Sequence, residues 1–179
     1  NLARTLALGG SRVVLVDGDL RNGGLHRVMG MPSEPGLAET LAHPEDLAKH
    51  LQTNCMPNLS FLARGKITVN SGDLFLGRNF DQLLARLRAE FEFVIIDSSP
   101  VFAADDACIL ASKADGTLFV VRRRYSSPGP VREALALLYQ RRARILGVIL
   151  NQADSSSAAN YYYKYSEYYG TAKAADKKS

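Results

Sequence analysis

Residues 12–21 read RVVLVDGDLR and decide the fold. Arg12–Asp17 (RVVLVD) is a short, continuous and β-branched run, which favours a strand buried on both faces of a parallel sheet. Two acids, Asp17 and Asp19, lie at its end. Because these acids are two residues apart, an extended backbone directs both carboxylates to one side. Ligands of open parallel sheets bind beyond the carboxyl ends of the strands, which is where these acids lie.

Residues 93–97 read FVIID and form a second apolar run that ends in an acid, Asp97. Helical patterns separate such runs, and the clearest one spans residues 80–91, with apolar side chains at Phe80, Leu83, Leu84, Leu87 and Phe91. This alternation predicts an α/β fold of three layers (α/β/α) with a mostly parallel sheet. Further strands are expected at 59–63, 117–121 and 145–150, and further helices at 1–9, 36–42, 44–51, 105–112 and 128–138. Loops are expected over the Gly- and Pro-rich stretch 21–35 and from the strand at 59–63 to about residue 73.

Length and composition indicate one globular domain. The chain has 179 residues, of which 46% are hydrophobic and 22% charged, so it is neither wholly disordered nor fibrous. No apolar run approaches the ~20 residues that span a bilayer. The net charge of +4 is modest, and we interpret it as a solvated basic surface without a nucleic-acid partner. Two cysteines, Cys55 and Cys108, suit a reducing compartment rather than a disulfide scaffold.

The composition changes after Gln152. A Ser/Ala-rich stretch over 153–159 is typical of a linker. Beyond it, six of the eight tyrosines fall within nine residues. We therefore divide the chain into a folded domain, residues 1–152, and a flexible tyrosine-rich tail, residues 153–179. The clustered tyrosines are Tyr161, Tyr162, Tyr163, Tyr165, Tyr168 and Tyr169.

The acids at the two strand ends suggest chemistry on nucleotides. An aspartate that follows an apolar strand is the Walker B arrangement, which holds magnesium directly or through water. Two such ends in one chain favour a magnesium–nucleotide site over two turn aspartates. The Gly-x-x-x-x-Gly-Lys-Ser/Thr pattern that cradles phosphates is absent, because Ile67 follows the only Gly-Lys pair, Gly65-Lys66. We therefore expect these 179 residues alone to bind ATP–magnesium weakly and to be inactive.

Four segments together resemble one known family. LVDGDLR at 15–21 is similar to the Walker A′ motif, and VIIDSSPV at 94–101 to the Walker B segment, of the bacterial tyrosine autokinases (BY-kinases) of capsule and exopolysaccharide assembly. GLAETLA at 36–42 and the tyrosine cluster also resemble that family. Partition and cell-division ATPases share the two Walker motifs but have no reason to carry the tyrosines. The resemblance implies a P-loop NTPase-like fold related to the partition ATPases, with the chain truncated just after its Walker A motif.

The resemblance also implies roles for particular residues. Asp17 would accept or orient the proton of a tyrosine hydroxyl, while Asp19 and Asp97 would hold Mg²⁺ beside ATP. Arg21 would contact phosphate or pair with the acids, which the residues alone leave open. Asn151, after the last strand, would contact the nucleotide base. The phosphoacceptors would be the six tail tyrosines.

The family resemblance implies partners and a location as well. It implies self-association in which the tail of one subunit enters the active site of another. It further implies a membrane polysaccharide co-polymerase as activator, a protein-tyrosine phosphatase, and a cytoplasmic position at the inner face of the bacterial membrane. Two alternatives stay open: a partition-type assembly ATPase that modifies no protein, and a non-catalytic scaffold.

Overall fold

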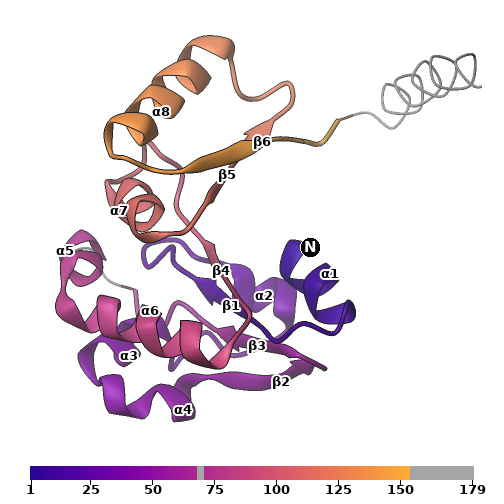
Figure 1. The fold of residues 1–179 in the computed structure, drawn as a ribbon, viewed down its shortest axis with the longest axis vertical. Coiled ribbons are helices and arrows are strands. Elements are labelled where there is room, and N and C mark those ends of the chain that lie inside the picture. The colour runs from indigo at the N-terminus through magenta and orange to yellow at the C-terminus, as the bar shows by residue number, and fades with distance from the viewer. Residues whose placement is uncertain (68–70, 154–179) are drawn as a thin grey trace, which may run out of the picture.

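The computed structural model describes residues 1–67 and 71–153, and strand β1 lies inside its main sheet (Figure 1). The sheet has four strands in the order β2-β3-β1-β4. β1 pairs in parallel with β3 and β4, as the sequence predicts, whereas β2 is an antiparallel edge strand that was not predicted. The strands span Val13–Asp17 (β1), Gln52–Met56 (β2), Leu59–Leu62 (β3) and Phe93–Asp97 (β4).

Helices cover both faces of this sheet, which confirms the three-layer prediction. Val14 and Val16 of β1 join a core with side chains of five helices, while Val13 and Leu15 pack on the opposite face against two others. This division follows from the two-residue period of a strand. The first group comprises α3 (Leu37–Ala42), α4 (Leu47–His50), α5 (Ser71–Leu76), α6 (Arg78–Glu90) and α7 (Asp106–Lys113), with the short helix η1 (Pro44–Asp46) between α3 and α4; the second comprises α1 (Leu2–Leu8) and α2 (Leu25–Met29).

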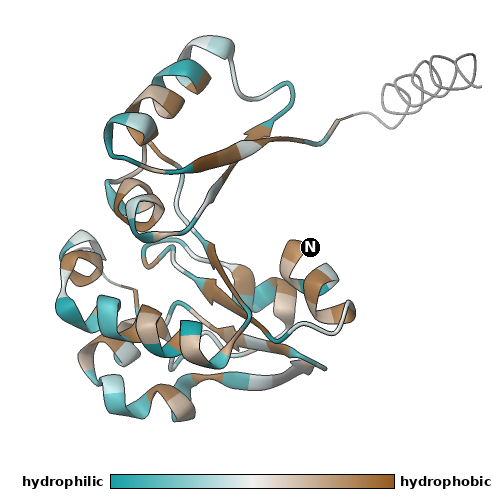
Figure 2. Ribbon diagram, in the orientation of Figure 1, coloured by the Kyte–Doolittle hydropathy of each residue, from teal (hydrophilic) through white to brown (hydrophobic). Residues whose placement is uncertain are grey.

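The remaining strands form a separate sheet. β5 (Thr117–Arg122) and β6 (Ile145–Asn151) pair in parallel, and side chains of α7 (Asp106–Lys113) and α8 (Pro128–Gln140) pack against them. Among the described residues β5 does not pair with β4, so the expected single sheet is observed as two (Figure 1). Both strands are largely hydrophobic, as the brown colour of their ribbons in Figure 2 shows. Six of their apolar side chains are exposed: Leu118, Val120, Leu146, Val148, Ile149 and Leu150.

Two short helices occupy segments that we predicted as loops. α2 lies within the glycine-rich stretch 21–35, and α5 begins at Ser71 in a stretch expected to be irregular to about residue 73. None of the helices in the described ranges is both long and apolar enough to cross a membrane. All six clustered tyrosines come after Ala153, so the predicted tail beyond that residue lies outside the described part of the chain.

Candidate nucleotide and magnesium site

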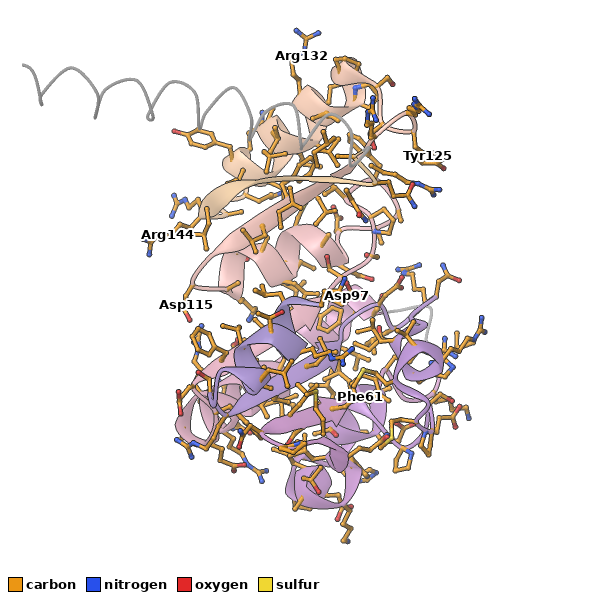
Figure 3. All side chains as sticks on the ribbon, turned by 90° about the vertical axis from the view of Figure 1, so that its right-hand side faces the viewer. Phe61, Asp97, Asp115, Tyr125, Arg132 and Arg144 are labelled. Atoms are coloured by element: carbon orange, nitrogen blue, oxygen red, sulfur yellow. The ribbon has the colours of Figure 1, made fainter. Side chains whose placement is uncertain are left out.

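The two acid-ending strands meet at one edge of the main sheet. Asp17 is the register partner of Asp97, so the last residues of β1 and β4 stand side by side. The next residue, Gly18, donates its N–H to the Asp97 carbonyl oxygen at 2.8 Å. A Cβ at Gly18 would lie only 2.7 Å from that oxygen, so glycine permits the close approach. Figure 3 shows Asp97 at the junction between the part of the molecule that contains the main sheet and the part that contains the remaining strands.

Asp17 is completely buried and anchors the loop that follows it. Its Oδ2 accepts the N–H of Leu25 at 3.1 Å, and its Oδ1 accepts the N–H of Asp19 at 3.4 Å. Burial raises the pKa of the Asp17 carboxyl, while these backbone N–H groups oppose the rise. Gly23 packs so tightly that a Cβ there would lie 2.3 Å from Asp17 Oδ1. The carboxylate is therefore both a stronger base than an ordinary aspartate and a structural anchor.

Asp19 and Asp97 present further carboxylate oxygens at this edge. Asp19 Oδ1 accepts the N–H groups of Arg21 at 3.2 Å and Asn22 at 2.9 Å, which closes a tight turn. Within the described ranges, Asp19 Oδ2 has no hydrogen-bond partner. Partial desolvation, followed by the negative charges of Asp17 and Asp19, raises the pKa of Asp97. Three mutually repelling carboxylates suit a bound cation.

The donor set fits magnesium bound together with phosphate. Mg²⁺ typically takes one or two carboxylates and completes its octahedron with water and phosphate oxygens. No group of three His, Cys, Asp or Glu side chains in the part of the chain that the structure describes could hold a metal ion by itself. Asp19 and Asp97 are therefore suited to supply part of the ligand set, and they do not form an all-protein metal cage.

Arg21 pairs with an acid that sequence reasoning missed. Its Nε donates to Asp106 Oδ2 at 3.3 Å and to Ser71 Oγ at 3.0 Å. The Ser71 hydroxyl donates to the same Asp106 oxygen at 2.5 Å. Both partners are almost completely buried. They lie 50 and 85 residues from Arg21, and no spacing in the sequence links them.

Asn151 is not joined to the aspartates. It ends β6, opposite Arg122 of β5, and its Oδ1 accepts the N–H of Gln152 at 2.9 Å. Among the described contacts, none connects Asn151 with Asp17, Asp19 or Asp97. The structure thus brings four of the predicted site residues to one sheet edge, places Asn151 at the end of the second sheet, and leaves the tail tyrosines outside the described residues.

Comparison with curated proteins reveals a consistent set of relatives. No family model matches the chain. The tyrosine-protein kinase CpsD of Streptococcus pneumoniae serotype 4 is 31% identical over 157 residues, which cover 87% of this chain and 69% of CpsD. The putative tyrosine-protein kinase EpsB of Ralstonia nicotianae is 36% identical over 170 residues, or 95% of this chain. The chain spans only 22% of the length of EpsB.

Solved structures give the same result. The kinase domain of the Escherichia coli tyrosine kinase ETK is 29% identical, with a TM-score of 0.80, covering 87% of this chain and 62% of that one. The cell division ATPase MinD of Pyrococcus furiosus has a TM-score of 0.66 at 21% identity, over 86% of this chain and 65% of MinD, and that likeness shows the fold alone. The fold is thus that of the P-loop ATPases, and the chain belongs to the family of bacterial tyrosine-protein kinases.

Proposed function

We propose that this chain is the greater part of the catalytic domain of an ATP-dependent protein-tyrosine autokinase that regulates the polymerisation and export of capsular polysaccharide or exopolysaccharide. The observation that carries the proposal is the register pairing of Asp17 with Asp97, with Asp19 in the adjoining turn. Acids at two neighbouring strand ends support a magnesium–nucleotide site in a chain that belongs to a family of tyrosine-protein kinases.

Each residue of the site has a separate role in the proposed phosphoryl transfer. The tyrosine hydroxyl oxygen attacks the γ-phosphorus of ATP, its proton passes to Asp17, and ADP leaves as the bridging bond breaks. A phenol has a pKa near 10, so a nearby base with a raised pKa favours this transfer. Asp19 and Asp97 would hold Mg²⁺, and the bound ion would neutralise charge on the transferring group. Asn151 is assigned to the nucleotide base. Of the two roles open to Arg21, an ion pair with an acid is observed with Asp106, and a phosphate contact by the same guanidinium is a proposal.

The acceptors in this proposal are the six tail tyrosines, presented by one subunit to the site of another. Each phosphate adds about −1.5 to −2 charges at pH 7, so repeated phosphorylation repels the tail from the acidic site. A membrane polysaccharide co-polymerase activates the kinase at the cytoplasmic face of the membrane, and a protein-tyrosine phosphatase reverses the modification. The support for these partners is membership of the family.

Labelling with radioactive ATP tests the proposal in the full-length gene product. We expect Asp17→Asn and Asp97→Asn each to reduce tyrosine labelling by roughly 10²–10⁴-fold. Asp105→Asn is the matched control, because its side chain is 72% exposed and makes a long ion pair with Arg141 at 3.8 Å. Near-normal labelling of either test variant would remove that residue from its role. ATP hydrolysis without any labelled tyrosine would instead indicate an assembly ATPase.

A further inference from the structure

The Arg21–Ser71–Asp106 cluster ties three segments of the chain together. Arg21 follows β1, Ser71 begins α5 and Asp106 begins α7. The side chains of Arg21 and Ser71 both donate to one oxygen, Asp106 Oδ2. The other oxygen, Oδ1, is buried and has no hydrogen-bond partner in the described part of the chain. A buried carboxylate is costly unless it is paired, and Arg21 is the ion-pair partner that this one has.

The cluster reaches the proposed magnesium ligand through one residue. The side chain of Arg21 is held by Ser71 and Asp106, while its backbone N–H donates to Asp19 Oδ1 at 3.2 Å. The neighbouring Asn22 N–H donates to the same Asp19 oxygen at 2.9 Å. Fixing the Arg21 side chain therefore fixes the turn that clamps Asp19 Oδ1. The clamp leaves Asp19 Oδ2 as the oxygen available to a cation.

We propose that Asp106 and Ser71 are positioning residues that, through Arg21, hold Asp19 in the orientation that binds Mg²⁺; this inference rests on the proposed function of the site. Groups that orient a metal ligand from the outside typically contribute 10–100-fold to metal affinity. A purely structural cluster would stabilise the fold without a specific effect on the metal-dependent part of nucleotide binding.

Calorimetry with ADP separates these two roles in the full-length gene product. The dissociation constant of ADP is measured with Mg²⁺ and again with EDTA. The value in EDTA divided by the value in Mg²⁺ is the gain in affinity due to the metal. We expect Asp106→Ala to reduce this ratio by about tenfold while the affinity in EDTA stays unchanged. Asp106→Asn retains an acceptor oxygen and should restore much of the ratio. Ser71→Ala should reduce it in the same direction.

The control is Asp105→Ala, which removes the adjacent but exposed acid and should leave the ratio unchanged. Circular dichroism checks that each variant is folded. If Asp106→Ala does not fold, Ser71→Ala decides the question. A wild-type ratio in folded Asp106→Ala or Ser71→Ala overturns the inference alone. If the wild-type protein itself shows no gain from Mg²⁺, the proposed magnesium site fails, and that result is distinct from the first.

Discussion

Replacing the Asp97 carboxylate with a neutral amide should stabilise the fold and abolish the kinase activity. Adjacent strands lie about 4.8 Å apart, and Asp17 and Asp97 are register partners. Two unit charges at that distance repel by about 1 kcal/mol in water and about 3.5 kcal/mol at an effective dielectric constant of 20. Because Asp97 is exposed, the lower figure applies. Asp97→Asn should therefore raise the free energy of unfolding by about 1 kcal/mol, which corresponds to roughly 2–4 °C in Tm.

The direction of the Asp97 pKa shift determines how the stability gain of Asp97→Asn changes with pH. The pKa of Asp97 is raised in the folded chain, so the folded state holds this proton to higher pH than the unfolded state does. Wild-type stability therefore falls as pH rises from the unfolded pKa of about 3.9 through the folded value, and the cost is fully present above it. The advantage of Asp97→Asn should be largest near pH 7.5 and should shrink toward pH 4. A Tm equal to or below wild type at pH 7.5, or a gap that does not change with pH, would refute the reasoning.

Three other predictions concern packing, the exposed strands and the nucleotide. Gly18→Ala should lower the stability by about 1–3 kcal/mol in scanning calorimetry, because its Cβ must displace the Asp97 carbonyl; Gly129→Ala, with nothing within 4 Å, should not destabilise the fold. Val120 is 57% exposed, so Val120→Lys should change Tm by less than about 2 °C and reduce binding of a hydrophobic dye, and a larger drop in Tm would show that Val120 is covered. The 179 residues alone should bind ADP–Mg²⁺ more weakly than about 1 mM, and micromolar binding in calorimetry would contradict that expectation.

Sequence patterns predicted the strands that build the site and most of the helices, but missed three short elements, β2, α2 and α5. β4 was predicted at its observed bounds, and β1 to within one residue, because both are continuous apolar runs that end in an acid. β2 was missed because it is a polar edge strand, Gln52–Met56, without the apolar run that marks a buried strand. α2 and α5 are only five and six residues long, so neither shows a helical period.

The sequence predicted which acids meet at the site, but not their burial or the partner of Arg21. Carboxylates at the ends of neighbouring parallel strands must meet, which is why Asp17 and Asp97 were placed correctly. The complete burial of Asp17 was not predictable, because it depends on how tightly Gly23 folds the following loop over it. The pairing of Arg21 with Asp106 was not predictable from the sequence either, because only tertiary packing brings the two side chains together.

The most direct test of the account is to locate phosphate by mass spectrometry after the full-length gene product is incubated with ATP and Mg²⁺. The account predicts phosphotyrosine within Tyr161–Tyr169, lost when Asp97 is replaced by Asn. Mixing an Asp97→Asn protein with a protein whose tail tyrosines are changed to Phe should restore it, because one subunit then supplies the site and the other the tail. Phosphate found only on Tyr125 or Tyr139 would contradict the account. So would phosphate on the tail of the Asp97→Asn protein when that protein is incubated by itself, without the second protein.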